Sequence, residues 1–269
     1  MRRVTIIALI VLTVFLLCLP DRPAVAKERL RYACSAQVYG AFGSEVLVVF
    51  QRNTGIEVET RISSSSKAVQ RLEYDFADIA STSRRILYDR MELGYVAIPF
   101  CKDPLAIIAN VQCPVDDITE DQLQDVFSGD ISNWKGVGGP DQSIVRVVPD
   151  KETSANKNFR RHVMKYKDMT YDIVTHISTD TIVVTEKLPW AISFIARGAV
   201  HGKEGIKVMR IDGRLPDDPG YPYFQVFYLV TKRTPIGPAR ALVDFVFSVD
   251  GKAIIKKRGM IPMERAPRD

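Results

Sequence analysis

The stretch Leu30–Ile62, LRYACSAQVYGAFGSEVLVVFQRNTGIEVETRI, contains a strand, a helix and a second strand in succession. Leu30–Cys34 is a short strand-like run. Val38–Arg52 carries apolar residues at the spacing of one helix face, and Gly55 provides the glycine that commonly ends a helix. Ile56–Ile62 then alternates as a half-buried strand does. Two strands joined by a helix form the unit from which parallel sheets are built.

The same alternation of strands and helices continues through the rest of the chain. Further strands are predicted at Ala77–Ala80, Val96–Phe100, Leu105–Val111, Val145–Val148, Ile182–Val184, Ala191–Ile195 and Val226–Thr231. Further helices are predicted at Lys67–Tyr74, Arg85–Leu93, Thr119–Phe127, Thr153–Tyr166 and Pro238–Phe247. This order predicts an α/β fold with mostly parallel sheets.

The composition is that of an ordinary globular protein of 269 residues, with 46% apolar and 26% charged residues. Lys and Arg number 37 against 32 Asp and Glu, which gives a net charge of +5. Without residues 1–26 the balance is 34 against 31, or +3. This excess is too small to indicate a nucleic-acid-binding protein, although it is compatible with small anionic ligands.

Residues 1–26 have the pattern of a secretory signal peptide. Arg2 and Arg3 precede the uncharged run Val4–Pro20, and Ala24–Ala26 offers the small residues that signal peptidase reads. The alternative, an uncleaved membrane anchor, is disfavoured because the run is shorter than the roughly 20 apolar residues of a spanning helix. We therefore expect a periplasmic or extracellular protein that keeps no membrane span after cleavage.

The predicted mature chain has three cysteines, Cys34, Cys101 and Cys113. The strand predicted between Cys101 and Cys113 would hold their sulfur atoms farther apart than a disulfide allows, so free and mostly buried thiols are expected. No group of His, Cys, Asp and Glu has the spacing of a metal site. The sequence also lacks a nucleophile elbow, a Walker loop and a dinucleotide fingerprint. We therefore expect no metal, no cofactor and no enzyme activity.

Three loops rich in small residues each follow a predicted strand and open a predicted helix: Cys34–Gln37, Ser63–Ser66 and Asp150–Ala155. The start of a helix presents unpaired N–H donors and a positive dipole end, which suits an anion. Any one of these hydroxyls could instead simply cap its helix. Because strand ends converge on one crevice in an α/β sheet, the three loops together favour a shared anion site.

Five segments, in the same order, resemble the phosphate-binding proteins of ABC importers. The most specific is Leu123–Asp141, LQDVFSGDISNWKGVGGPD, which is similar to that family's IfsGxixNWxxvGGpd motif. The others are Ala33–Val38, Phe76–Arg85, Val148–Phe159 and the C-terminal pair Phe247–Lys252 and Gly259–Pro262. The chain is therefore identified as a divergent member of the phosphate ABC transporter substrate-binding protein superfamily.

This resemblance implies a class II periplasmic-binding-protein fold, in which two α/β lobes joined by two crossing strands close on a ligand. The crossings are expected near Pro104–Val111 and Phe224–Val230. Residues 28–103 and 231–269 would then form lobe one, and residues 104–230 would form lobe two. An ABC permease is the implied partner. The protein is expected to be a monomer that does not bind nucleic acid.

The resemblance also implies a ligand site on the loops that end the strands. Its expected positions are Ser35, Ala36, Ser65, Ser66, Asp78, Thr153, Ser154 and Ala155. Asp78 would accept the proton of a protonated phosphate and so reject sulfate, although it could instead cap a turn.

Lobe two departs from the family pattern at several positions, and two of them, Pro149 and Glu152, change the charge expected at the site. Pro149 stands where many members have an arginine that clamps the anion, and Glu152 stands where they have a glycine. Losing the arginine removes a charge-assisted contact, and a carboxylate close to an anion would repel it. Other cations that could replace the arginine are Lys67, Lys151, Arg84 and Arg85.

The leading interpretation is an exported solute-binding protein that captures a small anion, with phosphate as the first choice, for an ABC importer. In the alternative interpretation the protein has the same fold but another role. It would bind another small molecule, or act as a sensor or partner-binding protein without transport. A secreted phosphatase is a third possibility, but the sequence offers it no nucleophile or metal cluster.

The leader pattern makes a specific prediction. Cleavage after Ala26 should leave Lys27 as the first residue of the exported protein. N-terminal sequencing of the protein recovered from outside the cytoplasm tests this. An intact Met1, or any other first residue, would contradict it.

Overall fold

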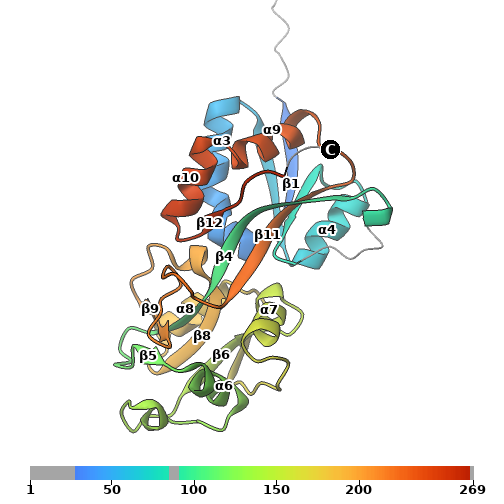
Figure 1. The fold of residues 1–269 in the computed structure, drawn as a ribbon. Coiled ribbons are helices and arrows are strands. Elements are labelled where there is room, and N and C mark those ends of the chain that lie inside the picture. Colours follow the sequence, from blue (N-terminus) through green and yellow to red (C-terminus); the bar gives the residue numbers. More distant parts are fainter. Residues whose placement is uncertain (1–27, 85–90, 267–269) are drawn as a thin grey trace, which may run out of the picture.

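The computed structural model describes residues 28–84 and 91–266. They form two α/β lobes joined by two long strands, β4 (Val96–Asn110) and β11 (Phe224–Thr231) (Figure 1). The predicted leader, residues 1–26, and residues 85–90 of one predicted helix lie outside this description. Within the described ranges, no helix is long and apolar enough to cross a membrane.

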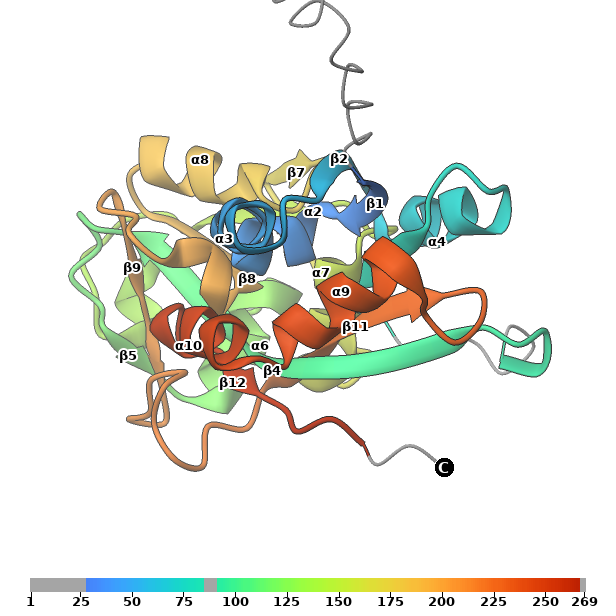
Figure 2. The same ribbon diagram turned by 90° about the horizontal axis from the view of Figure 1, so that it is seen from above.

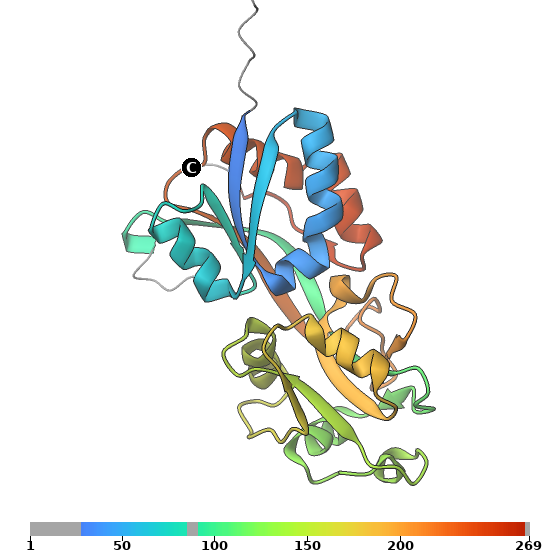
Figure 3. The same ribbon diagram turned by 180° about the vertical axis from the view of Figure 1, so that it is seen from behind.

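Lobe one is built around β1, whose neighbours β2 and β3 both run parallel to it. Its elements are β1 (Arg29–Ser35), α2 (Ala36–Val38), the π-helical turn η1 (Tyr39–Gly43), α3 (Ser44–Thr54), β2 (Glu57–Ser63), α4 (Ser65–Glu73), β3 (Ile79–Thr82), α9 (Gly237–Val246), α10 (Val249–Lys257) and β12 (Ile261–Pro262). Tyr32 and Cys34 pack into the core that contains α3, α9 and α10, while Ala33 between them packs with α4. This alternation follows from the pleat of the strand and places helices on both faces of the sheet (Figures 2 and 3).

Lobe two has a second core of its own. Its elements are β5 (Asp117–Ile118), α6 (Glu120–Ser128), the 3-10 turn η2 (Trp134–Val137), β6 (Val145–Pro149), α7 (Ser154–His162), β7 (Ile173–Thr175), α8 (Asp180–Lys187), β8 (Ala191–Ala196), the 3-10 turn η3 (Arg197–Val200), β9 (Ile206–Val208) and β10 (Arg210–Ile211). Trp134 is fully buried in this core beside Phe159 and Phe194, whose rings stack with centroids 3.7 Å apart. A capping box formed by Thr119 and Gln122 begins α6.

A single strand, β4, runs through both lobes in place of the two strands predicted at Val96–Phe100 and Leu105–Val111. Its first part pairs antiparallel with β11 and its second part antiparallel with β8. Pro104 is the last residue paired to β11, so its missing N–H falls where the strand changes partner. The sheet order is β2-β1-β3-β11-β4-β8-β6-β7, with β9 and β12 also paired to β4. The prediction of mostly parallel sheets is therefore correct within each lobe and wrong for the crossing strands.

The segment Ile182–Val184, predicted to be extended, lies instead in the helix α8. Its β-branched residues favour a strand when taken alone. The turn before it is closed by the Thr181 hydroxyl, which donates to the Ser178 carbonyl at 2.8 Å, and Ile182 is buried in the main core. Tertiary packing thus outweighs local propensity at this position.

The lobes meet along a tight seam that requires glycine. A Cβ atom added to Gly198 in η3 would lie 2.8 Å from the Ala41 carbonyl oxygen, and one added to Gly40 would lie 2.8 Å from Thr179 Cγ2. Residues of both lobes, among them Ala41 and Val200, share one hydrophobic cluster across this seam. The lobes are therefore in direct van der Waals contact.

A buried polar network lies beside the seam, on the crossing strands. Gln225 of β11 donates from Nε2 to Asp103 Oδ2 of β4 at 2.8 Å. Its Oε1 accepts from Gln37 Nε2 at 2.9 Å and from Asn158 Nδ2 at 2.7 Å. The Gly198 amide donates to Asp103 Oδ1 at 3.0 Å. One network thus joins lobe one, lobe two and both crossing strands.

This network predicts how stability depends on pH. Burial raises the pKa of Asp103 to about 7, although hydrogen bonds from Gln225 and Gly198 and the charge of Arg197 oppose the rise. The folded protein therefore keeps a proton that the unfolded chain releases between about pH 4 and pH 7. The contribution of Asp103 to the free energy of unfolding is therefore largest at low pH. It falls by on the order of 4 kcal/mol as the pH rises to 7 and stays constant at higher pH.

Urea denaturation of the wild type and Asp103→Asn between pH 4 and pH 8 tests this prediction. The wild type should lose its stability advantage over the variant as the pH rises, because the amide does not titrate. Asp168→Asn, at an exposed carboxylate, serves as the control and should run parallel to the wild type. A constant difference between the wild type and Asp103→Asn would show that Asp103 has an ordinary pKa.

Candidate functional site

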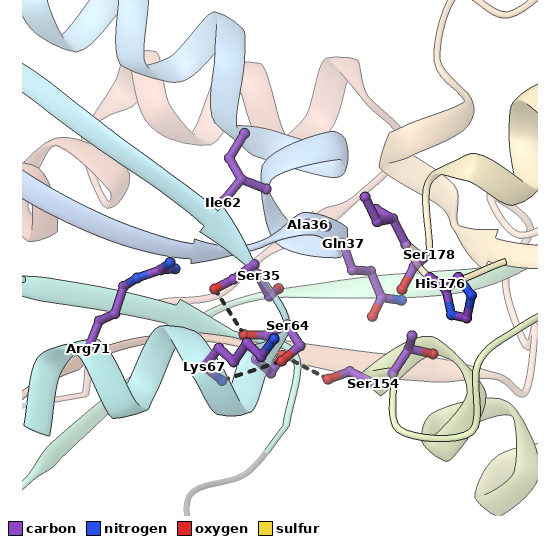
Figure 4. Close-up of a pocket in the computed structure, with 14 residues that line it drawn as sticks. Ser35, Ala36, Gln37, Ile62, Ser64, Lys67, Arg71, Ser154, His176 and Ser178 are labelled. Atoms are coloured by element: carbon purple, nitrogen blue, oxygen red, sulfur yellow. Dashed lines mark hydrogen bonds between the residues drawn. The ribbon is translucent and has the colours of Figure 1, made fainter.

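A cavity of about 360 Å³ lies where the two lobes face each other (Figure 4). Lobe one contributes the loops that follow β1 and β2 and the first turns of α4. Lobe two contributes the start of α7 and the loop between β7 and α8. The lining residues are Ser35, Ala36, Gln37, Ile62, Ser63, Ser64, Ser65, Lys67, Arg71, Thr153, Ser154, His176, Ile177 and Ser178.

Hydroxyl side chains begin the helices around this cavity. Ser35 Oγ accepts from the Val38 amide at 3.2 Å at the start of α2. Ser64 caps α4 by accepting from the Lys67 amide, and Thr153 caps α7 by accepting from the Asn156 amide. Serine and threonine are favoured at these positions because they satisfy N–H groups that have no carbonyl partner within the helix. The remaining N–H groups and the positive ends of α4 and α7 favour an anion nearby.

The two lobes already touch beside the cavity. Ser65 of α4 and Ser154 of α7 share a hydrogen bond with their oxygens 2.7 Å apart. Asn158 Nδ2 donates to the Ser83 carbonyl at 3.1 Å, and the Ser83 hydroxyl donates to Gln37 Oε1 at 2.8 Å. The structure therefore has the lobes closed on the cavity rather than apart.

The charge around the cavity is positive. Lys67 and Arg71, both from α4, line it. Among the described residues, no Asp or Glu lines it. Arg71 Nη1 is buried and has no hydrogen-bond partner within the described part of the chain. A buried charged donor without an acceptor is costly, and a rotation of the half-buried Arg71 side chain would bring this nitrogen to an anionic oxygen in the cavity.

The thiol of Cys34 lies near this arginine but does not contribute charge. Burial raises the pKa of Cys34 to about 12, although the charge of Arg71 opposes the rise. The thiol is therefore protonated at neutral pH and leaves Arg71 without an anionic partner of its own. Cys34, Cys101 and Cys113 are all free and buried, as the sequence predicts.

Five of the eight predicted site residues line the cavity, namely Ser35, Ala36, Ser65, Thr153 and Ser154. They come from segments about 120 positions apart in sequence, which the closed lobes bring together. The Thr153 hydroxyl is engaged locally, because it donates to the Asp150 carbonyl at 2.7 Å and accepts from Asn156. Thr153 therefore lines the cavity as the residue that caps α7, with its hydroxyl already used in local hydrogen bonds.

Two other predicted site residues do not line the cavity. Ser66 is exposed on α4, and its Oγ accepts from Arg84 at 3.4 Å. Ala155, one residue into α7, is fully buried in the main hydrophobic cluster. Consecutive residues of a helix point in different directions, so Ser66 and Ala155 point away from the cavity although Ser65 and Ser154, the residues just before them, line it.

Asp78 lies at the wrong end of its strand for the proton-acceptor role expected of it. It precedes β3, whereas the cavity is at the carboxyl ends of β1 and β2. Its carboxylate accepts from the Arg31 amide at 2.8 Å and from Arg31 Nη2 at 2.5 Å. Burial would raise the pKa of Asp78, but the hydrogen bonds and charge of Arg31 hold it below its ordinary value.

A second cavity of about 490 Å³ lies beside this ion pair, at the amino end of β1. Its acidic side chains are already paired, Asp78 with Arg31 and Asp75 with Lys232 at 2.8 Å. It therefore differs from the interlobe cavity, where one buried nitrogen of Arg71 has no partner within residues 28–84 and 91–266.

The two departures in lobe two take on a different meaning in the structure. Glu152 points into solvent, pairs with Lys157 at 2.6 Å and does not line the cavity, so it does not oppose an anion there. Pro149 offers no cation, but Arg71 and Lys67 supply charge from lobe one. Arg71 was not among the cations considered from the sequence. It lies four residues after Lys67 in a predicted helix, and this spacing places both on one face.

Comparisons with known proteins agree with this geometry. A family model described as the PBP superfamily domain matches residues 21–250. The phosphate-binding protein PstS of Borreliella burgdorferi is 25% identical over 78% of this chain and 81% of its own length. PstS of Bacillus subtilis is 27% identical over 59% of this chain and 55% of its own length.

Solved structures show the same fold. A phosphate ABC transporter substrate-binding protein from Clostridium perfringens, solved with bound phosphate, has a TM-score of 0.79 at 21% identity and covers 88% of this chain and all of its own. An ABC-type phosphate transport receptor from Vibrio cholerae has a TM-score of 0.65 at 20% identity over the same shares. The two-lobe fold and the match over residues 21–250 together show that this chain belongs to the PBP superfamily.

Proposed function

We propose that this chain is an exported solute-binding protein that captures phosphate between its lobes for an ABC importer. The observation that carries the proposal is the buried Nη1 of Arg71, which has no hydrogen-bond partner among the described residues, at a cavity that Lys67 also lines and that no described carboxylate lines. Such a set of donors suits an anion with several oxygens. The relatives named as phosphate-binding proteins support phosphate as that anion.

Most of the binding energy comes from lobe one in this proposal. Arg71 and Lys67 donate to phosphate oxygens, the Ser35 hydroxyl donates its proton, and the first N–H groups of α4 add further donors. Lobe two closes the site through Ser154, which already bonds to Ser65. Ser35, Ala36, Ser65 and Ser154 are thus the predicted positions that we retain as ligand contacts.

Transport and export form the remainder of the proposal. The named relatives are binding proteins, and the solved neighbours include components of ABC-type phosphate transport. None of these descriptions indicates an enzyme. The leader pattern in residues 1–26 supports a location outside the cytoplasm, where a binding protein meets its solute before passing it to a permease.

Replacing Arg71 by methionine tests the central contact. Phosphate affinity should fall about 10- to 100-fold in Arg71→Met, because a charge-assisted hydrogen bond is lost. The melting temperature of the ligand-free protein should change little, since the half-buried Arg71 side chain has one buried nitrogen without a partner among the described residues and methionine fills a similar volume. Titration calorimetry and thermal unfolding measure the two effects.

Arg52→Met on the exposed surface of α3 is the matched control and should leave phosphate affinity unchanged. Wild-type phosphate affinity in Arg71→Met would remove Arg71 from the site. A loss of affinity together with a large drop in the melting temperature of the ligand-free variant would show that Arg71 acts through the fold.

The absence of a described carboxylate from the cavity lining predicts weak discrimination between phosphate and sulfate. A carboxylate accepts the proton of a protonated phosphate and repels sulfate, but Asp78 lies outside the cavity. Sulfate should therefore bind within about tenfold of phosphate at neutral pH. Competition calorimetry measures this ratio, and a preference for phosphate above a hundredfold would require an acidic acceptor at the site.

A further inference from the structure

We propose that the preferred ligand of the interlobe cavity is a phosphate group that carries a short organic substituent, as in a phosphomonoester or an alkylphosphonate. This inference rests on the proposed function, because it assigns the phosphoryl group to the same Arg71 and Lys67 end of the cavity. It concerns the space that the phosphoryl group leaves unfilled.

The volume of the cavity is the first reason. Phosphate has five non-hydrogen atoms and takes on the order of 100 Å³, on the scale where one water molecule takes about 30 Å³. The cavity measures about 360 Å³. Volumes of roughly 300 Å³ and above are typical of pockets that hold organic molecules. Bare phosphate would leave most of this space to water.

Closure of the lobes does not remove that space. Ser65 and Ser154 are already 2.7 Å apart, and Asn158 already donates to the Ser83 carbonyl at 3.1 Å. The seam at Gly198 is equally tight, since a Cβ atom there would lie 2.8 Å from a backbone oxygen. Further approach of the lobes would push these atoms into each other, so the volume belongs to the closed form.

The chemistry of the walls is the second reason. Ile62 from lobe one is 49% exposed and Ile177 from lobe two is 50% exposed, and both line the cavity. Inorganic phosphate gains nothing from apolar walls, whereas an organic substituent would remove them from water. Figure 4 shows Arg71 and His176 at opposite sides of the drawn residues, with the serines between them. Lys67 is drawn among the serines, so the lining extends from Arg71 past Lys67 to His176 and offers more than one phosphoryl group would contact.

The charge of the lining limits the kind of substituent. Lys67, Arg71 and His176 line the cavity, and among the described residues no Asp or Glu does. An ammonium group would find no anionic partner there. The substituent should therefore be neutral, with carbon atoms that face Ile62 and Ile177 and with room for a hydroxyl near Ser178.

Calorimetry with a graded series of ligands tests the proposal. The probes are inorganic phosphate, methylphosphonate, n-propylphosphonate and sn-glycerol 3-phosphate, each titrated into the mature protein. Affinity should rise by about fourfold for each methylene that reaches the apolar walls. n-Propylphosphonate or glycerol 3-phosphate should therefore bind at least tenfold more tightly than inorganic phosphate.

A variant that fills the spare volume provides an independent test. Ile177→Trp should weaken the binding of n-propylphosphonate and glycerol 3-phosphate at least tenfold more than it weakens the binding of inorganic phosphate. Val174→Trp, at an exposed position of β7 outside the cavity lining, is the matched control and should change neither. Retained phosphate binding by Ile177→Trp shows that the variant is folded. If it binds no ligand, Ile177→Ala replaces it and should weaken the organic ligands alone.

The outcomes separate this inference from the proposed function. Inorganic phosphate that binds as tightly as every organic probe would overturn the inference and leave the proposed function standing. Equal weakening of all four ligands by Ile177→Trp or Ile177→Ala would also overturn the inference and leave the proposed function standing. If neither phosphate nor any organic probe binds, the proposed function fails and the inference fails with it.

Discussion

The side-chain amide of Gln225 fixes how the two lobes meet. It donates to Asp103 on the adjacent crossing strand and accepts from Gln37 of lobe one and Asn158 of lobe two. An unpaired buried polar atom costs about 1–3 kcal/mol, so sliding one lobe against the other would break several costly contacts together. The same arrangement holds the strand end at Ser35 opposite the helix start at Ser154.

The two lobes have different tasks at the cavity that this network holds together. One helix of lobe one, α4, supplies the cations Lys67 and Arg71, and lobe two supplies hydroxyls and the apolar side chain of Ile177. Lobe two can therefore carry Pro149 and an exposed Glu152 without losing the positive character of the site. In the proposed function, lobe one therefore holds the charge and lobe two covers it.

Local signals predicted the framework, and long-range packing decided the rest. The helix-start serines were visible because hydroxyls precede helical spacing, and five predicted site residues, including Ser35 and Ser154, line the cavity. The position of Asp78 could not be predicted from its motif alone, because the residue precedes β3 and the cavity lies at the opposite, carboxyl ends of the neighbouring strands. Arg71 was missed because its burial depends on the strands beneath α4. The helix over Ile182–Val184 was likewise set by tertiary contacts rather than by its β-branched residues.

A crystal structure of the mature protein grown with phosphate is the most direct measurement of the central claim. The account predicts the anion in the interlobe cavity, with one oxygen within hydrogen-bonding distance of Arg71 Nη1 and others near Lys67 and Ser35. An anion held in the second cavity, beside Arg31 and Lys232, would contradict it. So would an anion in the interlobe cavity bound only by lobe two, with Arg71 Nη1 still lacking an acceptor.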